Sequence, residues 1–141
     1  MFFFCNLNKK GNDELFCFGA NGRGEFGIGN NDDHSIPQEN KFFKDKKIKQ
    51  IACGIAHSLI LTGKKMKMIF NFLLENDELY SFGMNQNGEL GIGESKDQNT
   101  PQLVSFFNEI KIKKIYAGSE SSFVLIGKNF NFNPKCTFFR E

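Results

Sequence analysis

Several groups of residues in this 141-residue chain have the types and spacing that catalytic or ligand-binding sites use. Gly22-Arg23-Gly24-Glu25-Phe26-Gly27 matches the G-x-G-x-x-G pattern that holds a dinucleotide pyrophosphate at a helix N-terminus. Asp13-Glu14 and Asp77-Glu78 are paired carboxylates, which could serve as general acid and base. Asp32-Asp33-His34 combines three metal-ligating side chains, and His57 could be a base or a ligand. What each group can do depends on the element that positions it.

The glycine pattern lies in turn sequence. A dinucleotide site needs a helix to begin directly after the glycines, so that its N-terminus faces the phosphates. Here the segment Ile28-Gly29-Asn30-Asn31-Asp32-Asp33 follows, and its composition is typical of a loop. We therefore predict a structural turn and no bound cofactor.

An internal duplication organises the whole chain. Residues 12–29 align with residues 76–93 at twelve identical positions of eighteen, and the alignment continues without a gap at a constant interval of 64 residues. Chance does not produce such a match. We divide the chain into copy one (12–63), an intervening segment (64–75), copy two (76–127) and a C-terminal tail that leaves the pattern (128–141).

Each copy contains three short segments rich in β-branched and aromatic residues, and each segment is bounded by turn residues. The predicted strands are 15–18 and 79–82, 48–53 and 112–117, and 57–62 and 121–126. The last pair is apolar enough to be buried on both faces. Short strands that recur as a block favour an all-β fold of propeller type.

The order of residues in each copy resembles the regulator of chromosome condensation repeat. That repeat has a strand ending in aromatic-Gly, then an Asn, a Gly-acidic-Leu-Gly-x-Gly turn, a downstream Pro, and a strand closing in Gly-x-x-His. The matching repeat positions, which we interpret as structural, are Phe18, Gly19, Asn21, Gly24, Gly27, Gly29, Pro37, Gly54 and His57 in copy one and Phe82, Gly83, Asn85, Gly88, Gly91, Gly93, Pro101 and Gly118 in copy two.

Three features depart from the family pattern. The family usually has Trp where Phe18 and Phe82 stand, and Ser121 stands where copy two should have its His. The interval of 64 residues also exceeds the usual repeat by about the length of segment 64–74. That segment is either a real insertion, forming a lengthened hairpin, or a translated non-coding stretch, and we predict that it is not a core part of a blade.

The resemblance implies a β-propeller of about seven blades, of which this chain supplies about two. It also implies one of two functions: a scaffold or adaptor that binds other proteins, or a guanine-nucleotide exchange factor for a small GTPase. Because fold does not determine function, we favour the scaffold, with no catalytic residues of its own. We expect it to need further repeats or a partner to complete the propeller. A ubiquitin-ligase role would require an appended catalytic domain.

The duplication also bears on the polar candidates. Ser121 replaces His57 in copy two, so we predict that His57 is a structural residue, hydrogen-bonded within the blade. The Asp-Glu pairs precede strands in both copies, which predicts solvated turn residues. Asp32-Asp33-His34 corresponds to Lys96-Asp97-Gln98, which favours a surface loop over a metal site.

Charge and cysteine content exclude several other classes. The net charge of +2 gives no strong attraction to nucleic acid or membrane, so we expect neither partner. The local basic run (Lys41, Lys44, Lys46, Lys47 and Lys49, with Lys111, Lys113 and Lys114 in copy two) is interpreted as a solvated face. The four cysteines form no metal-type pair, and neither a signal peptide nor a membrane span is recognisable. We therefore expect reduced thiols in a cytoplasmic or nuclear protein.

The repeat also predicts a core. Apolar residues at matching positions should be buried at equivalent places in two blades: Phe18, Phe82, Ile51, Ile115, Leu59 and Phe123.

Overall fold

The computed structural model describes residues 2–6, 13–63, 68–69, 72–73, 77–108 and 110–127. These residues form strands and two short 3-10 helices, with no α-helix among them. In chain order the elements are β1 (Phe2–Asn6), β2 (Glu14–Gly19), β3 (His34–Glu39), η1 (Lys41–Phe43), β4 (Lys47–Cys53), β5 (His57–Gly63), β6 (Met68–Ile69), β7 (Phe72–Leu73), β8 (Asp77–Gly83), β9 (Gln98–Leu103), η2 (Ser105–Phe107), β10 (Ile112–Ala117) and β11 (Ser122–Ile126). Nothing in this part of the chain has the length and apolar character of a membrane-spanning helix.

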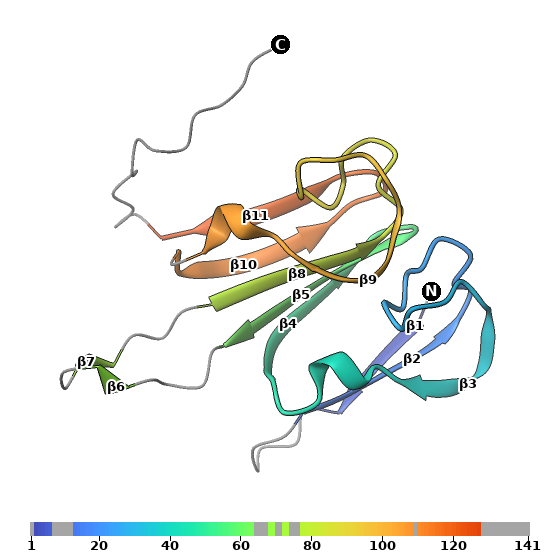
Figure 1. Ribbon diagram of the computed structural model, residues 1–141, viewed down its shortest axis with the longest axis horizontal. Coiled ribbons are helices and arrows are strands. Elements are labelled where there is room, and N and C mark those ends of the chain that lie inside the picture. The colour runs from blue at the N-terminus through green and yellow to red at the C-terminus, as the bar shows by residue number, and fades with distance from the viewer. Residues whose placement is uncertain are drawn as a thin grey trace.

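Three antiparallel sheets make up the body of the molecule. The central sheet has the order β4-β5-β8-β9, the N-terminal sheet β1-β2-β3 and the C-terminal sheet β10-β11. The central sheet lies between the other two, and β10 packs against β4 and β5 (Figure 1). This arrangement confirms the predicted all-β, propeller-type fold.

The boundary of a sheet differs from the boundary of a sequence copy. Strands β4 and β5 come from copy one, whereas β8 and β9 of the same sheet come from copy two. The described residues therefore form one four-stranded blade flanked by two partial sheets, a more specific arrangement than the two blades inferred from the count of copies. Each copy thus contributes strands to two neighbouring sheets, which are covalently connected through that copy.

Strand β1 takes the place in the N-terminal sheet that β5 takes in the central sheet. Phe2 of β1 pairs with Phe18 of β2, and Ser58 of β5 pairs with Phe82 of β8. Phe82 is the repeat counterpart of Phe18, 64 residues later in the chain. Seven residues connect the paired positions Asn6 and Glu14, whereas fifteen connect Thr62 and Glu78. The longer connection contains the two-residue pair β6-β7, and the remainder of segment 64–75 lies outside the described residues.

Strands β3 and β9 were not predicted from the sequence. Each contains a proline, Pro37 or Pro101, and each pairs with one strand only, β3 with β2 and β9 with β8. Proline lacks the N–H donor that a central strand needs, so it is found on edge strands. The same residues blunt these edges against further pairing.

Two apolar clusters fill the spaces between the sheets. The first joins the N-terminal and central sheets and consists of Leu15, Cys17, Phe26, Phe43, Ile48, Ile60, Tyr80 and Phe82. The second joins the central and C-terminal sheets and consists of Leu59, Leu61, Leu79, Val104, Ile112 and Ile115. Because successive side chains of a strand alternate between faces, Ile60 reaches the first cluster while Leu59 and Leu61 reach the second. The prediction of burial on both faces is confirmed for β5 and wrong for its counterpart β11, where Phe123 and Leu125 are exposed because no described sheet covers that face.

The predicted core is right at three positions and wrong at three. Phe82, Leu59 and Ile115 are fully buried, whereas Phe18 and Ile51 are only half-buried and Phe123 is 61% exposed. Phe18 and Phe123 occupy the outward sides of the two end sheets. Their repeat counterparts, Phe82 and Leu59, are covered by a neighbouring sheet. For Phe18 and Phe123, the repeat position therefore predicts burial only where a neighbouring sheet covers that face. Ile51 packs against the first cluster without being fully buried.

The pair Phe82 and Phe18 tests this explanation directly. Replacing Phe82 with Ala should lower the free energy of unfolding by about 3–5 kcal/mol, since the cavity would open between two sheets. Phe18→Ala removes the same atoms from a half-buried site and should cost less than half as much. Chemical denaturation of both variants measures the difference, and equal losses would contradict the account of the end sheets.

Candidate interaction surface at the loop end

Four connections gather at one end of the molecule because neighbouring strands are antiparallel. They are the β2–β3 loop (20–33), the β4–β5 turn (54–56), the β8–β9 loop (84–97) and the β10–β11 turn (118–121). We call this set the loop end. The long loops that form part of it lie on the right of the molecule in Figure 1. It contains the glycine pattern and Asp32-Asp33, and His34 and His57 are the first residues of the strands that leave it.

An asparagine organises each long loop. Asn21 is fully buried, and its side-chain oxygen accepts a hydrogen bond from the Phe26 N–H at 2.9 Å, while its Nδ2 donates to the Asn30 carbonyl at 3.0 Å. Asn85 makes the same bonds with Leu90 and Glu94, at 3.0 and 2.7 Å. A buried amide that satisfies both its donor and its acceptor fixes the loop around it.

Carboxylates in the loops accept hydrogen bonds from backbone N–H groups. In loop 20–33, Asp33 accepts from the N–H of Asn21 at 2.7 Å and Glu25 from that of Arg23 at 2.8 Å. Their counterparts Asp97 and Glu89 accept from Asn85 and Asn87 in loop 84–97. Although burial alone would raise the pKa of Glu89, the hydrogen bonds from its own N–H and from Asn87 lower it.

Glycines shape the same turns. Gly24 and Gly27 have φ of +81° and +62°, and Gly88 and Gly91 have nearly the same values, as predicted. The Gly24 and Gly27 N–H groups donate to the carbonyls of Asn21 and Gly24 in successive tight turns, and no helix begins there. The G-x-G-x-x-G segment is thus a structural turn without the helix N-terminus that a pyrophosphate would need.

Loop 20–33 is also joined across the sheets to loop 84–97 and to the start of β9. Arg23 contacts Asp97 at 3.1 Å, and the Gly29 N–H donates to the carbonyl of Asn99 at 2.8 Å. The Asn99 side chain donates to that of Asn31 at 2.9 Å. The loops therefore form one continuous surface.

Asp13, just before β2, and Asp77, the first residue of β8, are buried, so the prediction that these aspartates are solvated turn residues is wrong. Asp13 is 8% exposed and accepts a hydrogen bond from the buried N–H of Ile48 at 2.7 Å. Asp77 is 3% exposed and accepts from Ile112 at 3.1 Å. Each bond connects one sheet to the first strand of the next sheet along the chain, β4 or β10. The sequence alone did not indicate the partner N–H, which lies 35 residues away.

Serine hydroxyls repeat a second contact between sheets. Ser58 donates to the carbonyl of Glu25 at 2.8 Å, and Ser122 donates to that of Glu89 at 2.7 Å. Each hydroxyl extends from the next sheet to a loop of the preceding one. With the aspartates, these bonds give both sheet junctions the same polar contacts.

His57 lies within one of these junctions. It is fully buried, and its Nε2 lies 3.0 Å from the Ser122 oxygen. Because that hydroxyl donates its hydrogen to Glu89, Nε2 is the donor to Ser122. Burial lowers the pKa of His57, and the negative charge of Glu89 partly opposes this shift. The prediction that His57 is hydrogen-bonded within its own blade is therefore wrong, because its described bond joins the central sheet to the C-terminal sheet.

Asp32-Asp33-His34 does not come together as a ligand set. Asp33 binds a backbone N–H within its own loop, and His34 is the first residue of β3. Among the residues that the structure describes, no group of three or more His, Cys, Asp or Glu side chains could hold a metal ion.

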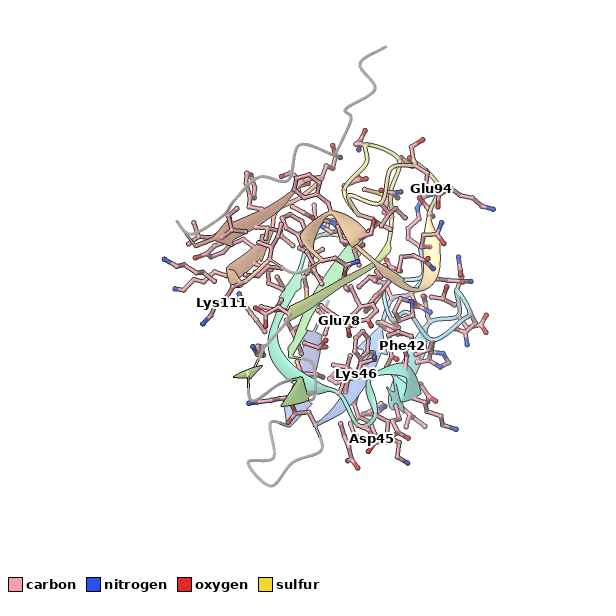
Figure 2. All side chains as sticks on the ribbon, turned by 60° about the vertical axis from the view of Figure 1, so that its left-hand side comes forward. Phe42, Asp45, Lys46, Glu78, Glu94 and Lys111 are labelled. Atoms are coloured by element: carbon pink, nitrogen blue, oxygen red, sulfur yellow. The ribbon has the colours of Figure 1, made fainter. Side chains whose placement is uncertain are left out.

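The basic run lies away from the loop end and does not form a single patch. Lys46 is half-buried, with Nζ 5.0 Å from the centre of the Phe42 ring and 3.3 Å from the Tyr80 hydroxyl, so it is not part of a solvated face. That hydroxyl donates to Glu78, and burial, with the Glu78 hydrogen bond and charge, raises the pKa of Tyr80 to about 12. Figure 2 shows Lys46, Phe42 and Glu78 close together, far from Glu94 of the loop end. Lys49 is not part of a solvated face either, because its Nζ forms an ion pair with the buried Asp77 carboxylate at 2.5 Å. The other members are exposed: Lys41, Lys44, Lys47, Lys111, Lys113 and Lys114.

Comparison with known proteins agrees with this geometry. The profile of the regulator of chromosome condensation (RCC1) repeat matches residues 12–61 and 76–125. The human X-linked retinitis pigmentosa GTPase regulator is 37% identical over 116 residues, which are 82% of this chain and 10% of that protein. The ultraviolet-B receptor UVR8 of Arabidopsis thaliana is 36% identical over 107 residues, 76% of this chain and 22% of the receptor. The crystal structure of human WBSCR16 matches with a TM-score of 0.58 at 25% identity, covering 88% of this chain and 29% of that one.

Sheets packed face to face through repeated apolar and polar contacts, with matching loops at one end, define a propeller-type repeat protein. The chain belongs to the RCC1 repeat family, whose profile matches both copies. It spans less than a quarter of the length of the two relatives.

The buried histidine predicts a pH dependence of stability. Its folded-state pKa lies below the ordinary 6.5, so the unfolded chain binds a proton that the folded chain resists, and stability should fall as the pH drops below about 6.5. His57→Gln retains a side-chain N–H donor and cannot be protonated in this range. Thermal unfolding from roughly pH 7 to pH 5 should show a flatter profile for the variant than for the wild type. Parallel profiles would contradict this assignment.

Proposed function

We propose that this chain is a protein-interaction scaffold and that the loop end is its binding surface. The observation that carries the proposal is a division within the two long loops. The buried polar residues of the two loops are the same in both copies, Asn21 and Asn85 or Glu25 and Glu89, whereas four pairs of exposed residues differ. The differing exposed pairs are Gly22 and Gln86, Arg23 and Asn87, Asn31 and Ser95, and Asp32 and Lys96.

This division is what a recognition surface requires. A constant buried framework holds each loop in one shape, so that little conformational entropy is lost when a partner binds. The exposed positions then present different chemistry from each loop on the same backbone. Rigid scaffolds that carry variable loops are a common design for binding proteins.

Catalysis finds less support. The loop carboxylates Glu25, Asp33, Glu89 and Asp97 accept hydrogen bonds from backbone groups, and His57 donates to a serine that is itself bonded to a carbonyl. Groups committed in this way stabilise the fold and have little freedom to move protons in a reaction. We therefore propose that the chain has no catalytic centre and binds other proteins.

Exchange of guanine nucleotide on a small GTPase is the alternative. One observation favours it: a relative at 37% identity is named a GTPase regulator. That relative is much longer than this chain, so the similarity concerns the repeats alone. Whether this chain promotes nucleotide exchange is a question for experiment.

A matched pair of triple variants tests the scaffold. Asp32→Ala, Gln86→Ala and Lys96→Ala remove exposed side chains of the loop end, whereas Lys41→Ala, Lys44→Ala and Ser105→Ala remove exposed side chains at the opposite end. Quantitative affinity capture from cell extract should lose specific proteins, by about fivefold or more, with the first variant only. Both variants should unfold at the wild-type temperature, since exposed substitutions cost little.

Two results would oppose the proposal. Equal capture by both variants would show that the loop end is not the binding surface. Accelerated release of labelled GDP from a small nuclear GTPase, abolished by the loop variant, would favour the exchange factor.

A further inference from the structure

The outer edge of β11 is open in the described part of the chain. Strand β11 pairs with β10 on one side, in the same way that β5 pairs with β4. On its other side β5 pairs with β8 along its full length, from His57 with Gly83 to Gly63 with Asp77. No described strand takes the place of β8 beside β11. Such an edge offers a row of backbone groups to an added strand.

Apolar side chains accompany this edge. Phe123 and Leu125 of β11 are 61% and 51% exposed, whereas their counterparts Leu59 and Leu61 of β5 are 1% and 3% exposed. Tyr116, which pairs with Phe123 across the sheet, is also half exposed. Three adjoining large apolar residues on one sheet face are the mark of an interaction site.

The glycines of the loop end show the same difference. A Cβ on Gly24 would meet Asn99 of β9 at 2.5 Å, and one on Gly27 would meet the Phe82 ring at 2.8 Å. A Cβ on Gly88 would meet nothing within 4 Å, and one on Gly91 only Val104 at 3.7 Å. The first loop is therefore covered by a β8–β9 pair, while the matching space over the second loop is open.

The elements that cover the first loop and β5 indicate what would fit over the second loop and β11. Over Gly24 and Gly27 the covering unit is a strand of the β8 type followed by an edge strand of the β9 type, and the described residues contain one other such unit, β2–β3. Leu59 and Leu61 are covered by Ile112 and Ile115 of the next sheet, and β2 likewise has the central sheet packed against it. In the β2–β3 unit Phe18 corresponds to Phe82 and is only half-buried. A β2–β3 unit therefore has the strand arrangement that would fit the open edge, and its Phe18 has apolar surface that this contact would bury.

We propose that β11 of one copy of this chain pairs with β2 of a second copy and so completes a four-stranded blade, β10-β11-β2-β3. In the register of β5 with β8, Phe123 stands opposite Cys17 of the second copy and Leu125 opposite its Leu15. Phe18 of the second copy covers Gly91, as Phe82 covers Gly27. Strand β1 yields its position, because it holds β2 in that same register, with Phe3 opposite Cys17.

This exchange substitutes one strand for an equivalent one and adds contacts that β1 does not make. The pairing lost with β1 is regained with β11, so the net gain comes from covering Phe123, Leu125 and the Gly91 loop. The association is head-to-tail, because the edge of one copy joins a different surface of the next.

Cross-linking through the native Cys17 tests the register. In a chain with Cys5, Cys53 and Cys136 replaced by serine, Phe123→Cys should give a disulfide-linked dimer under mild oxidation, joining position 123 to Cys17. Leu125→Cys, whose expected neighbour is Leu15, is the matched control and should give little of this dimer. Absence of the 123–17 link, or equal dimer from both variants, would overturn the proposal.

Sedimentation velocity of the full chain tests the association without cysteine chemistry. The wild type should form reversible oligomers with rising concentration, and Phe123→Lys should weaken this association by about tenfold or more. Ile55→Lys changes an equally exposed residue at the loop end and should leave association unchanged. Both sites are exposed, so both variants should fold. A wild type that stays monomeric, or equal weakening by both substitutions, would contradict the proposal.

Discussion

The packing of one sheet against the next is the interaction on which the rest of this structure depends. A sheet of this kind is apolar on both faces, as the alternation of Leu59, Ile60 and Leu61 between two clusters shows, so it is stable only between neighbours. The junctions also contain polar contacts that repeat with the chain. An aspartate binds the N–H of an isoleucine in the next sheet, and a serine binds a loop carbonyl of the preceding one. These bonds offset the cost of burying backbone groups where two sheets meet.

The same constraint explains why side chains with catalytic potential serve the architecture. A propeller-type repeat must turn the chain sharply at each loop and bury part of that turn against the neighbouring sheet. Asn21, Glu25 and Asp33 hold the turn, and glycine at positions 24 and 27 allows the close approach of Asn99 and Phe82. Function then depends on the side chains left exposed. The two loops differ at those positions, and this variation on a fixed framework is the basis of the proposed scaffold.

Much of the fold could be predicted from the sequence, because duplication reveals which residues a repeat cannot change. The inner strands and the glycine turns follow from apolar alternation and from positions that require positive φ. Strands β3 and β9 could not be found in this way, since Pro37 and Pro101 and polar neighbours make them resemble loops. The burial of Asp13 and Asp77 was also missed, because their N–H partners lie 35 residues away and only the packing of sheets brings them together. The prediction that Phe123 is buried was wrong because no described sheet covers the outward face of its sheet, although a phenylalanine suits a core position.

Hydrogen exchange at the amides of Ile48 and Ile112 tests the central claim most directly. In the wild type both N–H groups should exchange slowly, as do the amides of the central sheet, because each is buried and bonded to an aspartate across a sheet junction. Asp13→Ala should accelerate exchange at Ile48 and leave Ile112 protected, and Asp77→Ala should have the converse effect. If both amides exchanged in the wild type as fast as those of exposed loops, or if neither substitution altered them, the sheet junctions would not hold the structure together as described.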